Sequence, residues 1–308
     1  MLPCLRPALT ALAFCLLLPA VAGAAVHARL TPRVELGAGH ASALYVGDED
    51  GSRSYLLLSP GLSFDLSTSP WLKFFATYRY AFTGYDRGGD GQGHEGELLA
   101  RLRMGFRWDV ELFGGVDRML FPEPVSALPS DPLSSRSIAI SAGTRVRHRL
   151  RETSTAELTY GLQRRRSDAD EVASVFETSH EIDALWLERM RPDLQLGARL
   201  RWTSSAASEA IYDYGGVGAS LLAGFVPFGD LVLRGSVGVH FNQYEVAGHD
   251  DRFAFASFTV SHPLGESLWA DASLSYARND LLAGRAEGYE GDRSAGFFGL
   301  RAELPWWL

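Results

Sequence analysis

The stretch from Gly296 to Leu308 constrains the fold more than any other part of the chain. From Phe298 onward every second residue is apolar, and the residues between them are mostly small or charged, as at Gly299 and Arg301. A repeat of two residues places successive side chains on opposite faces of an extended strand. The pattern therefore predicts a strand with one apolar face and one polar face. The apolar set is Phe298, Leu300, Ala302, Leu304, Trp306 and Leu308.

The same alternation recurs along the chain in about fourteen segments, each near the roughly 9–11 residues that a tilted strand needs to cross a bilayer. They are 29–43, 54–67, 71–84, 95–108, 110–121, 137–149, 155–166, 173–187, 194–203, 210–225, 231–244, 252–262, 268–278 and 293–308. The fold class is therefore predicted to be all-β. Two segments do not follow the simple pattern: a β-bulge is expected at Gly215-Gly216, and 252–262 is apolar on both faces and cannot be oriented.

The connections between these segments alternate between long and short. Long ones are Tyr45–Arg53, Tyr85–His94, Pro122–Arg136 and Asn279–Asp292, and a short one is Pro263–Ser267. Transmembrane barrels have short periplasmic turns and longer outer loops. A secreted soluble β-sandwich or propeller is the rival fold, but it explains neither this rhythm nor apolar faces that run the whole length of a strand.

The terminal strand pattern and the opening segments Val34–His40, Tyr55–Leu66 and Trp71–Phe82 resemble bacterial outer-membrane β-barrels of the porin-like kind. Some of those barrels accompany export of surface polysaccharide. The resemblance implies a transmembrane up-and-down antiparallel barrel of about fourteen strands, with about 12–16 as the range. It also implies an outer-membrane location, insertion by the barrel-insertion machinery through the last strand, and contact with outer-membrane lipid, lipopolysaccharide and other envelope proteins. In most of that class the final residue is aromatic, whereas here it is Leu308.

The first 24 residues are predicted to be a secretory signal peptide. Arg6 supplies the positive start, Ala8–Ala20 forms an apolar run, and Ala22-Gly23-Ala24 fits the cleavage site. Cleavage after Ala24 leaves 25–308 as the barrel. The two cysteines, Cys4 and Cys15, lie in this leader, so no disulfide or thiolate metal site is expected in the mature chain.

Charge and motifs argue against several classes of function. The net charge of −8 does not suit a nucleic-acid partner, which needs a basic face. The histidines show no zinc spacing, and no nucleotide-binding glycine motif occurs, so neither a metal nor a cofactor is expected. A lipid-cleaving barrel needs a serine beside a lipid-facing histidine. His180 has the lipid-facing parity, but no serine occupies the outward positions of 194–203, and a bulge turning His180 inward is favoured. The chain is therefore not expected to be an enzyme.

Charged residues on the polar faces are candidate pore-lining side chains, because a charge facing lipid at mid-membrane costs about 2–4 kcal/mol. Basic and acidic segments alternate, and neighbours in sequence are neighbours in an up-and-down barrel. The charges can pair across strands, orient a polar solute in a wet pore, or do both. The candidates are Arg101, Arg103, Arg107, Arg145, Arg147, Glu157, Glu177, Glu181, Asp183, Arg199 and Arg201.

The connection Leu120–Arg136 combines four prolines with an apolar content that is unusual for a solvated tip. A constriction or a contact with a partner is one interpretation, and a simple prolyl surface loop is the other. The candidates for the first are Phe121, Val125, Leu128 and Leu133. The leading hypothesis for function is a pore or exporter for polar solutes or surface polymer. The alternative is a non-transporting barrel that anchors or docks partners in an envelope-spanning or surface-adhesion complex.

Overall fold

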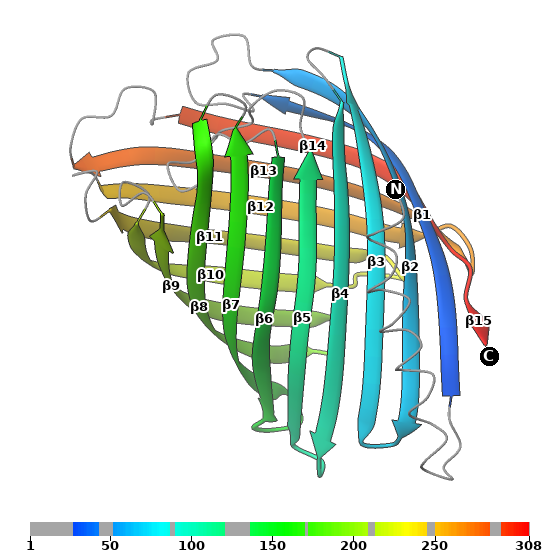
Figure 1. Ribbon diagram of the computed structural model, residues 1–308. Coiled ribbons are helices and arrows are strands. Elements are labelled where there is room, and N and C mark those ends of the chain that lie inside the picture. The colour runs from blue at the N-terminus through cyan, green and yellow to red at the C-terminus, as the bar shows by residue number, and fades with distance from the viewer. Residues whose placement is uncertain are drawn as a thin grey trace.

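The computed structural model describes residues 27–42, 52–86, 90–120, 136–169, 172–208, 213–244, 250–283 and 291–307. Fourteen long antiparallel strands, each paired with its neighbours in sequence, form one closed barrel (Figure 1), which confirms the predicted fold. The strands are β1 (His27–Ser42), β2 (Arg53–Ser69), β3 (Leu72–Tyr85), β4 (Gly91–Met104), β5 (Trp108–Leu120), β6 (Arg136–Arg149), β7 (Ser154–Ala169), β8 (Val172–Arg191), β9 (Leu194–Ala207), β10 (Tyr214–Phe225), β11 (Val232–Tyr244), β12 (Asp250–Pro263), β13 (Leu268–Ala283), β14 (Gly291–Glu303) and the short β15 (Trp306–Trp307).

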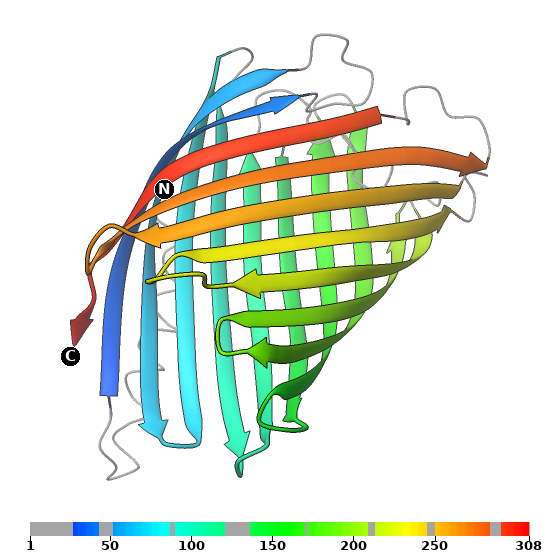
Figure 2. The same ribbon diagram turned by 180° about the vertical axis from the view of Figure 1, so that it is seen from behind.

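The barrel closes where β14 pairs with β1, along a register that runs from Arg33 opposite Glu303 to Ser42 opposite Ser294. Figure 2 shows β14 running beside β1 at this seam. Phe297 on β14 lies over Gly37 on β1, where any Cβ would overlap its ring. Glycine at this position therefore lets an aromatic side chain cover the seam from inside.

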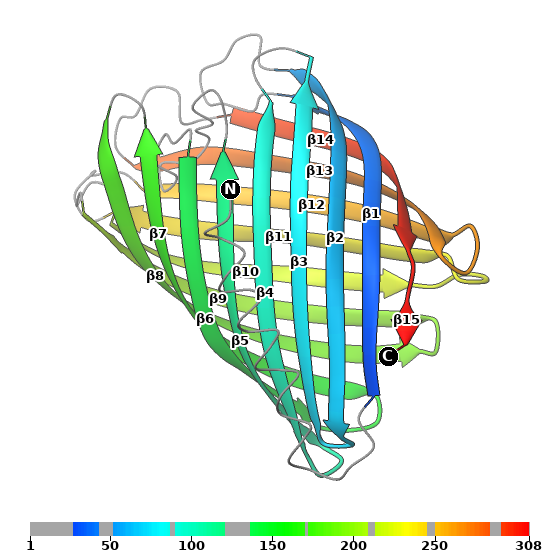
Figure 3. The same ribbon diagram turned by 45° about the vertical axis from the view of Figure 1, so that its right-hand side comes forward.

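Two ends of the barrel are distinguished by their connections. The short turns 70–71, 105–107, 150–153, 192–193, 226–231 and 264–267 lie at the end where β1 starts, here called the turn end. Figure 3 shows β2 and β3 joined there, with β15 beside β1. The opposite end, where β1 ends at Ser42 and β5 ends at Leu120, is called the loop end.

Several strand boundaries differ from the predicted ones, and two of the differences have a clear local reason. The fourth strand was expected at 95–108 but ends at Met104, because Gly105 adopts a φ of 66° that the turn requires. Arg107 therefore lies in a turn and not on a strand. The last strand was expected to be continuous, but Pro305 has no N–H to donate, so β14 ends at Glu303 and pairing with β1 resumes at β15.

The outer surface is an apolar band. Even-numbered residues face outward on β1–β9 and on β12–β14, and odd-numbered residues face outward on β10 and β11. The change of parity falls in the connection 208–213, and β10 pairs with both neighbours without a register shift, so the expected bulge at Gly215-Gly216 is wrong. β12, which the sequence could not orient, turns its even positions outward because Ala254 pairs with outward Val239.

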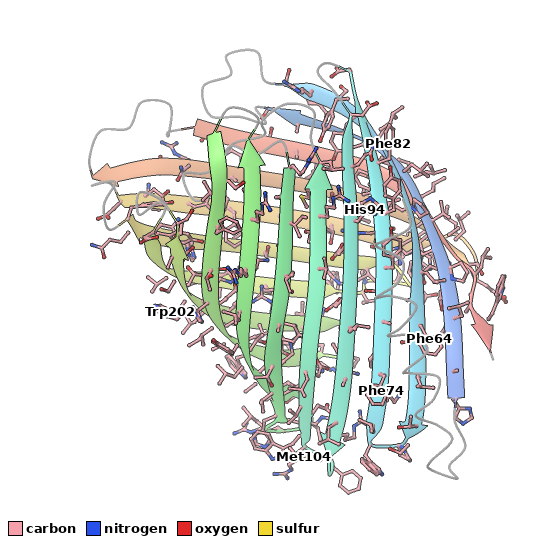
Figure 4. All side chains as sticks on the ribbon, viewed as in Figure 1. Phe64, Phe74, Phe82, His94, Met104 and Trp202 are labelled. Atoms are coloured by element: carbon pink, nitrogen blue, oxygen red, sulfur yellow. The ribbon has the colours of Figure 1, made fainter. Side chains whose placement is uncertain are left out.

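Large apolar side chains are exposed on this surface, with 68% of Leu56 and 63% of Leu221 accessible. In Figure 4, Trp202 lies outside the wall, while Met104 marks the turn end of β4 and His94 its upper part. A soluble sandwich would bury such residues between its sheets. The described residues include no helix that is long and apolar enough to cross a membrane.

Candidate functional site

Two rows of side chains cross the interior face from β4 to β9, each row linking residues that lie directly opposite one another on neighbouring strands. Such register partners lie about 4.5–5.5 Å apart at Cβ, so their charges interact directly. The first row is Arg101, Glu111, Arg145, Thr159, Asp183 and Arg201. The second row, one step nearer the turn end, is Arg103, Asp109, Arg147, Glu157, Leu185 and Arg199.

Glu111 is the centre of the larger group of ion pairs and is only 1% exposed. Arg101 Nε donates to Glu111 Oε1 at 2.5 Å, and Arg145 Nη1 donates to Glu111 Oε2 at 2.9 Å. Arg147 Nη2 donates to Glu157 Oε2 at 2.8 Å, and Arg145 Nε lies 3.1 Å from Glu157 Oε1. We call these five residues the Glu111 cluster. Its three arginines face two carboxylates, so it carries an excess positive charge.

A second group surrounds Asp183. Arg201 Nη2 donates to Asp183 Oδ2 at 3.0 Å, and Arg199 Nε lies 3.2 Å from Asp183 Oδ1. Glu181 Oε1 lies 3.5 Å from Arg201 Nε. This group, the Asp183 cluster, balances two arginines with two carboxylates.

Aromatic rings support the arginines of the Glu111 cluster from the loop-end side. The guanidinium carbon of Arg145 lies 5.7 Å from the centre of the Phe113 ring, and that of Arg101 lies 5.2 Å from the Phe75 ring. Cations are attracted to ring faces at this distance. The rings and carboxylates together hold the guanidinium groups against the wall at a fixed height.

The structure brings together most of the predicted pore-lining residues but not all of them. Arg103 pairs with Asp109 at 3.2 Å beside the Glu111 cluster. Arg107, in the turn after β4, lines a pocket of about 110 Å³ with Arg103, Asp109 and Arg147. Glu177 lies apart from both clusters and accepts a hydrogen bond of 2.7 Å from Ser205 Oγ. The candidate loop residues Phe121, Val125, Leu128 and Leu133 lie outside the described residues.

Sequence reasoning missed two polar groups across the barrel from these clusters. Asp251 on β12 is 1% exposed and accepts a hydrogen bond of 2.8 Å from Asn242 Nδ2. Arg301 Nε on β14 donates to Asp271 Oδ2 on β13 at 3.0 Å. Asp251 was missed because the predicted segment 252–262 begins one residue after it, whereas β12 begins at Asp250.

The wall from β10 to β13 differs from the charged wall. In the described residues of these strands, the interior charges are Arg234, Asp251 and Asp271, and the other interior positions are mainly small, hydroxyl-bearing or aromatic. They include Gly216, Gly218, Ser220, Ser236, Phe253, Phe255, Ser257, Thr259, Ser273 and Ser275. The interior therefore has a charged side and a nearly uncharged side.

His180 faces outward, and the expectation that a bulge turns it inward is wrong. Its Nδ1 is hydrogen-bonded to Tyr160 Oη at 2.9 Å. Its register partner on β9 is Ser204, which the sequence prediction missed because β9 extends past residue 203 to Ala207. Among the described residues no hydrogen bond joins His180 to Ser204, and no group of three or more His, Cys, Asp or Glu side chains is placed to hold a metal ion.

No protein-family model matches the chain, and no curated protein matches it. Among solved structures it is similar to an anion-selective porin from Comamonas acidovorans, with 12% identity, a TM-score of 0.51, and coverage of 91% of this chain and 100% of the porin. It is also similar to the outer-membrane protein OmpT of Vibrio cholerae, with 10% identity, a TM-score of 0.55, and coverage of 91% and 97%. A bacterial polysaccharide outer membrane secretin has 11% identity, a TM-score of 0.50, and coverage of 90% and 98%. At these identities the likeness shows a shared fold, that of outer-membrane β-barrels.

Proposed function

We propose that the protein is an integral outer-membrane barrel that acts as a passive pore for polar solutes. The observation that carries the proposal is the pair of charged rows on the interior face of a closed fourteen-strand wall. Barrels of about eight strands are filled by side chains, whereas about sixteen to eighteen strands leave an aqueous channel. Charged side chains held against the inner face of such a wall favour a water-filled interior.

The outside of the barrel supports a membrane location. Its exposed apolar band matches hydrocarbon, and the short turns and longer loops match the periplasmic and outer ends of such barrels. In this proposal residues 1–24 are removed during export, and β14 and β15 present the pattern that the barrel-insertion machinery reads.

The two sides of the interior favour a solute with both charged and uncharged polar groups. The Glu111 cluster attracts anionic groups, and the hydroxyl-bearing and aromatic side chains opposite can contact sugar rings or other uncharged parts. The likeness to a polysaccharide secretin agrees with a polymer as cargo at the level of the fold. Polar solutes and exported surface polymer therefore both belong to this proposal.

The test is single-channel recording of the purified barrel in planar bilayers. A shift in gel migration on heating first shows that the purified barrel is folded. We then expect this folded protein to give discrete conductance steps. A folded, inserted barrel without conductance would overturn the pore and leave the anchoring role as the remaining function.

We also propose that the barrel is not an enzyme, because Tyr160 engages His180 Nδ1 and no hydrogen bond joins His180 to Ser204. Fatty-acid release from phospholipid vesicles is the appropriate assay. Hydrolysis by the native protein that disappears in the Ser204→Ala variant would contradict this part of the proposal.

A further inference from the structure

Arginine side chains interrupt the apolar band on the outside of β5 and β7 near the loop end. Arg118 shares the outward parity of Leu112 and Val116, which are exposed. Arg164 and Arg166 follow Tyr160 and Leu162 on the outward side of β7, and both are exposed. These three arginines lie on the surface that faces lipid if the barrel spans a membrane.

The register fixes how far apart these arginines lie. Arg118 is opposite Ile138 on β6, which is opposite Arg166 on β7, and Ile140 is opposite Arg164. Neighbouring strands lie about 4.8 Å apart, and two residues along a strand span about 6.7 Å. The Cα atoms of Arg118 and Arg164 are therefore about 12 Å apart, with the exposed Ile138 and Ile140 between them. We call these five residues the arginine patch.

Arg166 and Arg118 differ in the contacts that they make with described protein groups. Arg166 donates to Ser174 Oγ at 3.3 Å and lies 5.6 Å from the Phe176 ring centre. Arg118 Nε is shielded from solvent and has no hydrogen-bond partner among the described residues.

The described outward side chains of β4 to β8 in this half of the barrel include no carboxylate. They include Gln92, His94, Val116, Leu120, Ile138, Ile140, Leu162, Thr178 and His180, together with Ser174 and Phe176. Arg136 does not belong to the patch, since its register partner on β7 is the acidic Asp168, whose side chain is outside the described set.

Two outward arginines on another part of the loop-end rim, Arg252 and Arg278, are paired with a carboxylate of the protein. On β12 and β13, Arg252 Nη2 lies 2.5 Å from Asp280 Oδ2, and Arg278 Nε lies 2.6 Å from Asp280 Oδ1. The chain thus pairs outward arginines with carboxylates on one side of the barrel. On the other side Arg118 and Arg164 are set among isoleucines.

The height of the arginine patch limits what can neutralise it. An arginine facing lipid costs about 2–4 kcal/mol at mid-membrane and about 0–1 kcal/mol near the interface. Two outward pairs, Tyr78 with His94 at 2.8 Å and Tyr160 with His180 at 2.9 Å, flank the patch with the amphipathic rings that favour the headgroup level. The patch therefore belongs at the headgroups of the leaflet on the loop-end side, which is the outer leaflet in barrels of this kind.

We propose that the arginine patch binds the phosphorylated glycolipid of the outer leaflet, the lipid A part of lipopolysaccharide. Guanidinium groups bind phosphate through paired, charge-assisted hydrogen bonds. Two arginines about 12 Å apart suit a disaccharide headgroup with a phosphate at each end better than a single-phosphate headgroup. Acyl chains then lie along Ile138 and Ile140. This proposal rests on the outer-membrane location proposed above.

The test measures binding of bisphosphorylated lipid A to the detergent-solubilised barrel by native mass spectrometry, with phosphatidylglycerol as the competing phosphate source. We expect at least about tenfold weaker binding in the double variant Arg118→Gln/Arg164→Gln, or a loss of about 1.4 kcal/mol. The matched control is Arg252→Gln, an outward arginine of the same rim, which should bind as the native protein does.

Unchanged lipid A binding in the double variant would overturn the proposal, and so would equal affinity of the native protein for phosphatidylglycerol. If the glutamine variant fails to fold, Arg118→Lys/Arg164→Lys keeps the charge but loses the paired geometry, and an affinity equal to the native value would again contradict the proposal. Insertion into pure phospholipid bilayers tests the membrane location separately, because failure there removes the proposed pore and not only the patch.

Discussion

Glu111 on β5 and Arg145 on β6 are register partners, and Arg145 Nη1 donates a hydrogen bond of 2.9 Å to Glu111 Oε2. Since the same guanidinium also lies 3.1 Å from Glu157 on β7, one side chain ties three strands together on the inner face. These contacts stabilise the packing of the three strands and also determine the net charge on the inner face. Variants can separate the two effects.

The ion selectivity of the pore should depend on Glu111. The Glu111→Gln variant leaves three arginines against one carboxylate, so anions should be favoured more strongly. A unit charge roughly 4–10 Å from an ion in water contributes about 0.4–1 kcal/mol, or a change in permeability ratio of about two- to sixfold. Reversal potentials under a salt gradient measure this change. Glu266→Gln in the exposed turn after β12 is the control, and an equal shift in both variants would show that the cluster does not act on the permeating ion.

The orientation of β10 can be tested by introducing arginine at each of two adjacent positions in turn. Leu221→Arg places a charge on the apolar outside and should cost about 2–4 kcal/mol, whereas Ser220→Arg points inward and should be tolerated. Urea titration of folding into lipid vesicles gives the difference. Equal destabilisation by both substitutions would contradict the change of parity between β9 and β10.

The closing seam should be sensitive to added volume at Gly37. A methyl group there overlaps the Phe297 ring, and overpacking of this kind costs about 1–3 kcal/mol. We expect a lower urea midpoint for Gly37→Ala and partial recovery when Phe297→Leu is added. Gly215→Ala, where a Cβ meets nothing within 4 Å, should leave the midpoint unchanged.

The contribution of β15 to assembly can be separated from its contribution to stability. Trp306 is exposed, and β15 is joined to β1 over only two residue pairs, so Trp306→Ser should barely alter folding in detergent. If the insertion machinery reads this segment, the same variant should accumulate poorly in the outer membrane. Cell fractionation with a quantitative immunoblot compares the two, and a normal outer-membrane yield would argue against recognition of Trp306.

The inside and outside of most strands could be predicted from the sequence because hydrocarbon and water impose opposite demands on alternate residues. That is why Arg103 was correctly predicted to face the interior before any register was known. The same reasoning failed at β12, where Phe253 and Phe255 line the interior, so polarity did not separate the two faces. It also failed at the turn after Met104, where the backbone conformation of Gly105 and not side-chain polarity ends the strand.

The charged wall was predictable as alternating basic and acidic strands, but its pairing was not. Whether Glu111 contacts one arginine or several depends on the register between neighbouring strands. Turn length fixes this register, and a change in it shifts every residue pair along the two strands. The outward arginines of β7 were missed because alternation shows which face a residue occupies but not its height along the barrel axis. The sequence therefore did not show where the hydrocarbon ends and the headgroups begin.

The hydrogen bond between Ser42 and Ser294 joins residues separated by 252 positions in the chain. The chain must therefore be synthesised through β14 before the first strand can pair with its final neighbour. Until then, β1 offers an unsatisfied row of amides and carbonyls to any other extended peptide. Loss of β14 would therefore not give a slightly narrower pore. It would leave an open sheet with two unpaired edge strands, which is prone to proteolysis and aggregation.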